Sequence, residues 1–227
     1  MWLRQADAHS NDISVLVNAA LALGFDPELS RQLANRALAI EPKNHKMLET
    51  VAESYTREMR FANSLEDRRA FAKRALRAWE ICTAAGDNCQ PTELAISAFE
   101  AGDFVKAKQY ATQLLDISKV QYQEVAADNL HVANTVLGRL ALRNGNIAEA
   151  KSRLLASVRD EGSPVLSSYG PSMALAAELL DHGERDVVIV YLDKCARFWA
   201  FGHGQIGQWK LEIQAGKKPD FGDNLRP

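Results

Sequence analysis

Apolar residues recur every three or four positions along most of the chain, and the pattern is clearest on either side of a polar turn at residues 143–146. This spacing predicts two amphipathic helices that meet at the turn. Gly145 provides the backbone freedom that ends the first helix, and Asn146 is a typical N-cap for the second. Small residues at Gly138 and Ala150 would allow two antiparallel helices to approach each other closely.

The same spacing predicts helices along the rest of the chain. Residues 2–6 resemble the last turns of a helix. Asp26 is a typical N-cap, and Pro27 is typical of the first turn of the helix that follows. Turns like the one at residues 143–146 recur at 102–104 and 181–185. The predicted helices, some with approximate ends, span residues 13–23, 26–40, 47–59, 68–85, 92–101, 104–118, 120–143, 147–158, 185–199 and 205–215.

Residues 131–164 resemble a tetratricopeptide repeat (TPR), a helical hairpin with a 34-residue pattern of Leu-Gly and Trp, Tyr, Ala and Phe positions. Leu137, Gly138 and Ala150 match that pattern, and the turn at 102–104 aligns with the one in this stretch. The sequence departs from the pattern at the aromatic positions and at the proline, which lies slightly late; the residues concerned are Asn134, Ala141, Leu154 and Pro164.

The resemblance implies an all-α fold, a right-handed α-solenoid of TPR-like helical hairpins with a C-terminal capping helix. Each hairpin has an apolar face that only its neighbours can bury. We expect one solenoid domain over residues 1–227, with four to five hairpins over about 10–199 and the capping helix and tail in 202–227. Ile206, Trp209 and Ile213 form the apolar face of that last helix, and Phe221 is expected to hold the tail against it.

Composition and charge exclude several functions. The 27 basic and 29 acidic residues give a formal net charge of −2, so no overall field attracts nucleic acid or anionic membrane. The basic cluster in residues 68–77 is therefore interpreted as a solvated helix face rather than a nucleic-acid contact. No apolar run reaches the roughly 20 residues of a membrane span. A cytoplasmic location is expected, or an exported one if an upstream signal has been removed.

The sequence contains few candidate catalytic or metal-binding residues. The five histidines lack the spacing of metal ligands, and they are interpreted as surface, cap or turn residues. No nucleotide-binding or serine-hydrolase motif is present, so we expect no metal, no cofactor and no catalysis. Cys82 and Cys89 flank a short turn and could pair in an exported protein, although unpaired thiols are the favoured interpretation.

The resemblance implies a non-catalytic interaction module that binds a peptide segment or partner subunit in a concave groove, and a homo-oligomer is a further option. In TPR proteins the first helix of each hairpin lines that groove. Helical phase then gives the candidate binding residues Ile96, Phe99, Asn134, Thr135, Arg139, Leu142, Met173 and Leu180. Arg139 is expected to bind a carboxylate or carbonyl. In the alternative interpretation, Ile96, Phe99 and Met173 only complete the packing between hairpins.

A second function class stays open. The chain could be an enzyme, or an accessory subunit of one, with a pocket where the irregular second helix pair meets the third. The absence of a catalytic constellation favours the interaction module.

Overall fold

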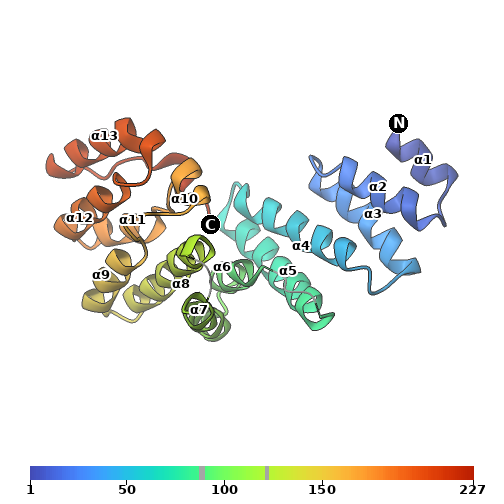
Figure 1. The fold of residues 1–227 in the computed structure, drawn as a ribbon, viewed down its shortest axis with the longest axis horizontal. Coiled ribbons are helices and arrows are strands. Elements are labelled where there is room, and N and C mark those ends of the chain that lie inside the picture. Colours follow the sequence, from blue (N-terminus) through green and yellow to red (C-terminus); the bar gives the residue numbers. More distant parts are fainter. Residues whose placement is uncertain (87–89, 121–122) are drawn as a thin grey trace. The chain divides into compact units, whose positions relative to one another are not determined.

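The computed structural model describes residues 1–86, 90–120 and 123–227, and every regular element in them is helical (Figure 1). The helices pack in consecutive pairs along the chain, which confirms the predicted all-α class. They form two compact units, Met1–Asp103 and Phe104–Pro227. The boundary between the units falls in the turn that was predicted at residues 102–104.

The first unit contains six helices in its described residues. They are α1 (Trp2–Ala8), α2 (Ile13–Ala22), α3 (Pro27–Ile40), α4 (His45–Arg60), α5 (Leu65–Ala84) and α6 (Pro91–Ala101). Asp26 caps α3 as predicted, because its carboxylate accepts a hydrogen bond of 3.0 Å from the Leu29 amide. Helix α5 begins three residues before the predicted start at 68, because the Ser64 hydroxyl caps it by accepting from the Asp67 amide.

Small side chains allow the first three helices to pack closely. Their core combines the fully buried alanines of α1, α2 and α3 with Leu16, Leu33 and Met47. Further along, Trp79 of α5 is 1% exposed, and its indole N–H donates a hydrogen bond of 2.9 Å to the Thr56 hydroxyl of α4. The burial of Trp79 therefore leaves its polar atom satisfied.

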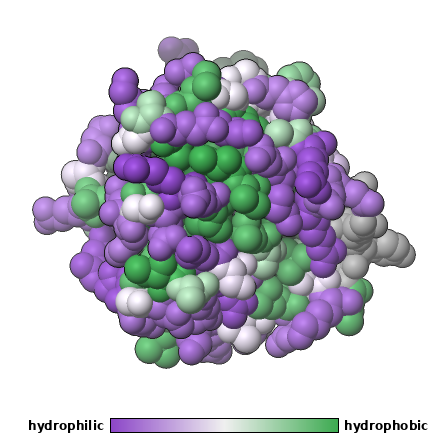
Figure 2. Space-filling model, turned by 90° about the vertical axis from the view of Figure 1, so that its left-hand side faces the viewer, coloured by the Kyte–Doolittle hydropathy of each residue, from purple (hydrophilic) through white to green (hydrophobic). Residues whose placement is uncertain are grey.

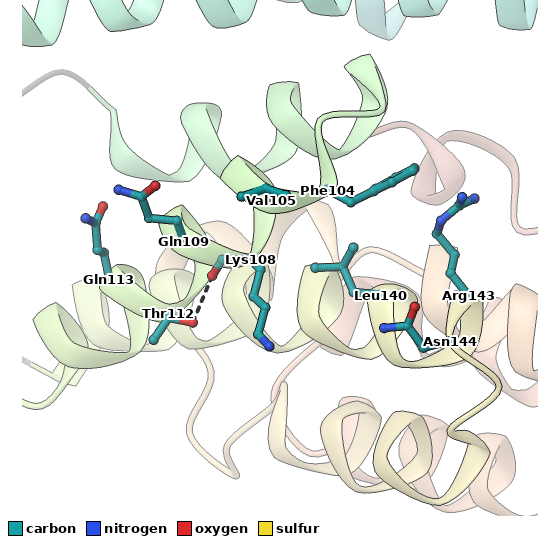
Figure 3. A pocket seen from close by; sticks show the side chains of 9 residues that line it. All are labelled: Phe104, Val105, Lys108, Gln109, Thr112, Gln113, Leu140, Arg143 and Asn144. Atoms are coloured by element: carbon teal, nitrogen blue, oxygen red, sulfur yellow. Dashed lines mark hydrogen bonds between the residues drawn. The ribbon is translucent and has the colours of Figure 1, made fainter.

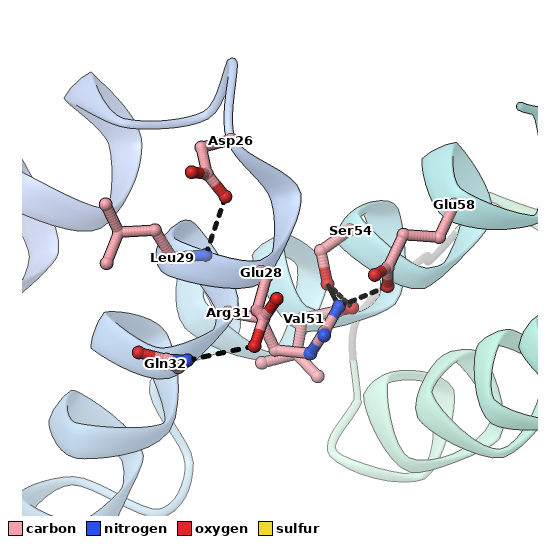
Figure 4. Close-up of polar contacts among 8 residues, drawn as sticks. All are labelled: Asp26, Glu28, Leu29, Arg31, Gln32, Val51, Ser54 and Glu58. Atoms are coloured by element: carbon pink, nitrogen blue, oxygen red, sulfur yellow. Dashed lines mark hydrogen bonds and ion pairs between the residues drawn. The ribbon is translucent and has the colours of Figure 1, made fainter.

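Helices α3 and α4 are joined by a polar cluster centred on Arg31 (Figure 4). The Arg31 guanidinium pairs with Glu58, donates to the Ser54 hydroxyl over 3.3 Å, and lies 4.3 Å from the ring centroid of Tyr55. Because both members of the ion pair are mostly buried, removal of either would leave a charge with little access to water. The cluster fixes one side of α4 against α3.

The second unit contains seven α-helices and two short 3-10 turns in its described residues. They are α7 (Phe104–Ser118), α8 (Gln123–Arg143), α9 (Ile147–Ala156), α10 (Pro164–Tyr169), α11 (Ala174–Asp181), α12 (Arg185–Cys195), η1 (Ala200–Gly202), α13 (His203–Gln214) and η2 (Gly222–Leu225). The predicted extension at the front of α8 is confirmed from Gln123 but is wrong at Val120, which lies in the turn after α7. Residues 121–122 lie outside the described part. Helix α10 was not predicted, although Ser163 and Pro164 are typical of a helix start.

The hairpin of α8 and α9 has the predicted turn. Gly145 has a positive φ of 73°, and the Asn146 side chain accepts a hydrogen bond of 3.1 Å from the Glu149 amide. Gly138 lies where helices meet, since an added Cβ would come within 3.1 Å of Arg153 Cβ in α9 and 2.3 Å of Leu175 Cδ2 in α11. The close approach that the small residue was expected to allow is therefore present.

His131 is buried, so its interpretation as a surface, cap or turn residue is wrong. Its Nδ1 lies 3.2 Å from the Ser157 carbonyl oxygen, and its Nε2 accepts a hydrogen bond of 2.8 Å from the Ser172 amide. Burial lowers the pKa of His131 to about 4. The neutral ring, with its proton on Nδ1, satisfies both backbone groups and ties α8 to the segments after α9 and before α11.

The C-terminal helix covers an aromatic core. Ile206, Trp209 and Ile213 are buried as predicted, and Phe221 is 1% exposed. The Trp209 ring lies 5.0 Å from Phe221 in an edge-to-face arrangement and 6.0 Å from Trp199, between ring centroids. The tail is thus held against α13 through Phe221.

The tail also binds the segment between α10 and α11. The Asn224 carbonyl oxygen accepts a hydrogen bond of 2.8 Å from the Met173 amide. The Asn224 side chain donates to the carbonyl oxygens of Tyr169 and Pro171, over 3.1 and 3.2 Å. These bonds satisfy backbone groups that no regular element pairs.

The outer surface of this end of the second unit is mixed rather than wholly polar. Figure 2 shows a hydrophobic band between polar areas on the face that lies at the left of Figure 1, where α9, α12 and α13 lie. The exposed apolar side chains of α12 and α13 include Val190 and Leu211, which are 48% and 63% exposed. Beside them, Lys210 pairs with Asp193.

The cysteines differ from one another. Cys82 is buried and disulfide-bonded, so its interpretation as an unpaired thiol is wrong. The partner that the sequence suggests, Cys89, lies outside the described residues. Cys195 is a free thiol, and burial raises its pKa to about 12, so it has no thiolate character at neutral pH.

Candidate functional site

One side of α4 in the first unit faces two hollows, and we call its residues Thr50, Glu53, Ser54, Arg57 and Arg60 the α4 surface. The first hollow has a volume of about 110 Å³ and is lined by α4, by the end of α2 and by the start of α3. The second has a volume of about 350 Å³ and is lined by α4, α5 and α6 together with Phe61 and Gln90. Glu53 and Arg57 line both hollows, which are therefore adjacent.

The two arginines of this surface connect α4 to its neighbours. The Arg57 guanidinium donates a hydrogen bond to the Gly24 carbonyl oxygen, in the loop after α2. Arg60 donates to the Glu93 carboxylate of α6 over 2.5 Å. The second oxygen of Glu93 is buried and has no hydrogen-bond partner in the described part of the chain. The walls of both hollows are thus held by charged side chains.

Glu53 differs from the other charged groups of the α4 surface. Among the described residues it forms neither a hydrogen bond nor an ion pair. Partial burial raises its pKa, and the negative charges of Glu49 and Glu93 add to that effect, while Lys46 and Arg57 oppose it. An acceptor without a donor, placed between two hollows, can bind an ammonium, a guanidinium or a backbone N–H of a ligand.

The second hollow also has an apolar wall. Phe61, directly after α4, is 58% exposed, and Trp79, whose indole N–H is bound to Thr56, also lines the hollow. Apolar surface beside a few directed polar groups is typical of ligand sites in proteins. No His, Cys or Ser lines this hollow, so it lacks a nucleophile paired with a base.

The candidate residues predicted from the sequence lie elsewhere, and most are buried. In the second unit Thr135, Leu142 and Met173 are at most 8% exposed, and Met173 is fully buried. Arg139 of α8 donates to Glu178 of α11 over 2.7 Å, so its guanidinium joins two helices. Leu180 packs against the same core. These side chains contribute to packing within the unit.

The Asn134 side chain is also bound within the second unit. Its side-chain amide donates to the carbonyl oxygens of Leu130 and Ala156, and its oxygen accepts from Arg153 over 3.3 Å. In the first unit Phe99 is 9% exposed and Ile96 is half-buried. The burial of Phe99 and Met173 agrees with the alternative interpretation, in which they complete the packing between helices.

Sequence reasoning did not find the α4 surface. Glu53, Arg57 and Arg60 are spaced by three or four residues, which places them on one side of a helix. That spacing is visible in the sequence, but charged residues at such spacing usually form a solvated helix face. The helix also belongs to the pair with the poorest TPR match, so no repeat position indicated which side faces a groove.

No protein-family model matches this chain, and no match was found among curated proteins. Among the described residues, no three or more His, Cys, Asp or Glu side chains are grouped so that they could hold a metal ion. No helix in the described ranges is long and apolar enough to span a bilayer. The structure therefore defines the class only as an all-helical protein of consecutively paired helices.

Proposed function

We propose that this chain is a non-catalytic interaction module of the TPR type, a right-handed solenoid of helical hairpins, and that its α4 surface binds an extended peptide segment. The observation that carries the proposal is the unpaired Glu53 carboxylate between two adjacent hollows. An extended segment that crosses α4 would occupy both hollows at once.

Helix contacts support the TPR-type stacking within each unit. In stacked hairpins, the first helix of one hairpin contacts the first helix of the next, and second helices contact second helices. In the second unit α8 contacts α11 and α9 contacts α12. In the first unit α2 contacts α4. Helices α2, α4 and α6, which border the hollows, would be the first helices of their hairpins.

The charges of the α4 surface suit a peptide with a basic side chain. Glu53 would accept from a Lys or Arg of the peptide, or from a backbone N–H. Arg57 bonds a neutral carbonyl and keeps further N–H groups that could bind a peptide carbonyl. Phe61 offers an apolar contact at the end of the second hollow. Glu93 is already paired with Arg60, so Glu53 is the residue whose loss should weaken binding most.

Selection from a displayed library of random 12-residue peptides, with the whole chain as bait, tests the proposal. Enriched peptides are then labelled, and their Kd values are measured by fluorescence anisotropy. We expect enriched peptides to contain Lys or Arg, and Glu53→Gln to raise Kd at least about ten-fold, because a hydrogen bond to a charged group is lost. Glu66→Gln, at an exposed glutamate of α5, is the matched control and should leave Kd unchanged.

The proposal fails if no peptide with Lys or Arg is enriched over an unrelated helical bait, or if the enriched basic peptides bind equally well to the Glu53→Gln protein. Thermal unfolding of each variant separates lost binding from lost folding. Because Glu53 is exposed and unpaired, the Glu53→Gln protein should melt like the parent.

The enzyme alternative has one observation in its favour. The second hollow lies where the second and third predicted helix pairs meet, and a carboxyl group with a raised pKa lines it. Raised carboxyl pKa values are frequent at catalytic sites. Turnover of a substrate that is abolished in the Glu53→Gln protein would support this alternative over peptide binding.

A further inference from the structure

A groove runs between α7 and α8 in the second unit, and it is the larger of the hollows described here, with a volume of about 660 Å³ (Figure 3). We call it the α7–α8 groove. Helix α7 contributes most of its lining, and the last turn of α8 closes one end. The lining residues are Phe104, Val105, Lys108, Gln109, Thr112, Gln113, Leu140, Arg143 and Asn144.

The groove has an apolar end where the start of α7 meets the end of α8. Leu140 is 9% exposed, Phe104 is half-buried, and Val105 is 80% exposed. Figure 3 shows the Phe104 and Leu140 side chains close to the Arg143 end of α8. An apolar side chain of a partner placed here would remove Val105 and the Phe104 ring from water, which is favourable.

The ionisable side chains that line the groove are all cations. Lys108 and Arg143 are exposed, and no carboxylate is present among the lining residues. Neither side chain forms an ion pair with any described residue. The groove therefore complements a negative charge that the second unit does not itself supply.

The Arg143 side chain is positioned to bind such a charge. Its guanidinium carbon lies 3.9 Å from the centroid of the Phe104 ring, which is a close cation–π contact. Stacking restrains the planar group and leaves its N–H edges free. A stacked guanidinium can donate two parallel hydrogen bonds to one carboxylate with little further loss of side-chain freedom.

We propose that the α7–α8 groove binds an acidic peptide segment that places an apolar side chain against Phe104, Val105 and Leu140 and a neighbouring carboxylate on Arg143. Lys108 adds a second cation along the groove. The volume lies within the range of sites that hold small ligands or short segments. The α4 surface lies in the first unit and shares no residue with this groove, so either site can fail without the other.

Two synthetic 12-residue peptides test the proposal, both fluorescein-labelled and titrated with the whole chain. The first carries one central Leu flanked by Glu residues, and the second has Ala in place of that Leu at the same charge. We expect saturable binding of the Leu peptide and at least ten-fold weaker binding of the Ala peptide. Arg143→Glu and Val105→Asp should each raise the Kd of the Leu peptide at least ten-fold, and Arg143→Lys several-fold, because Lys keeps the charge but loses the planar fork.

Matched controls lie in the same unit. Arg159→Glu reverses an exposed cation outside the groove, and Val165→Asp changes a valine that is 53% exposed on α10. Both should leave Kd within about two-fold of the parent, and so should Glu53→Gln on the α4 surface. The side chains altered in the three groove variants, Arg143 and Val105, are exposed, so thermal unfolding should show near-parental stability.

Three results would overturn the proposal. The first is absence of saturable binding. The second is equal binding of the Leu and Ala peptides, which would indicate attraction by charge alone. The third is an equal loss of affinity for the Leu peptide in the groove and control variants. Unchanged groove binding in the Glu53→Gln protein, together with failure of the library selection at the α4 surface, would refute only the proposed function.

Discussion

Replacement of Trp209 by Ala tests whether α13 is an integral part of the second unit or an appendage to it. Trp209 is 6% exposed and lies between Trp199 and Phe221, so its ring joins the helix core to the tail. Its indole N–H donates to the Asp220 carbonyl oxygen over 3.1 Å. The substitution removes the ring contacts and this hydrogen bond together.

The expected loss of stability follows from the burial of the Trp209 side chain. Removing a buried Trp or Phe side chain costs about 3–5 kcal/mol, and that range already contains the aromatic contacts. The lost hydrogen bond adds little, because Asp220 is exposed and water can reach its carbonyl group. The tail beside Trp209 can move to fill part of the cavity, so we expect about 3 kcal/mol, which lowers Tm by about 10 °C in a unit of this size.

Far-UV circular dichroism during heating measures the Tm of each protein. Leu211→Ala is the matched control, because Leu211 lies on the same helix but is 63% exposed, and it should change Tm by less than about 2 °C. Trypsin should also cleave the Trp209→Ala protein faster after Lys217 if the tail is released. A Trp209→Ala protein that melts within about 2 °C of the parent would show that α13 contributes no core packing.

Two further predictions concern buried positions in the second unit. His131→Gln should make stability less dependent on pH, because the pKa of His131 is about 4 in the folded protein and about 6.5 in the unfolded chain. The free energy of unfolding of the parent, measured with urea, should fall by about 2 kcal/mol from pH 7 to pH 5 because of this group, and the variant should lack that decrease. An equal loss in both proteins would contradict this. Gly138→Ala should lower stability by about 1–2 kcal/mol, because overpacking against Leu175 and Arg153 exceeds the gain in helix propensity, and a raised Tm would refute it.

Much of the helical architecture was predictable because local signals marked the helix boundaries. Asp26, Gly145 and Asn146 cap or end helices through contacts within a few residues, and such contacts are readable from sequence. Apolar spacing likewise identified the buried face of α13. Helix α10 is only six residues long and has one buried apolar residue, so periodicity could not reveal it.

The candidate sites were less predictable, because exposure depends on contacts between distant segments. Met173 has the spacing of a groove residue, yet its side chain is fully buried and its amide is bonded to Asn224 of the C-terminal tail. Lys108 is not among the candidate binding residues, which were sought on the first helices of the hairpins. Its place in the α7–α8 groove arises from the last turn of α8, which lies more than thirty residues later in the chain. Helical phase alone carries no information on such neighbours.

The bonds from Asn224 to the segment between α10 and α11 impose an order on folding during synthesis. The carbonyl oxygens of Tyr169 and Pro171 receive their donor from a residue made 55 and 53 positions later. At ~5–20 residues per second, the ribosome adds those residues in roughly 3–11 s. During that interval the apolar core of the second unit is incomplete until α13 and Phe221 have been made, whereas the helices of the first unit have already been made. The second unit is therefore the part of the nascent chain with most need of chaperone protection.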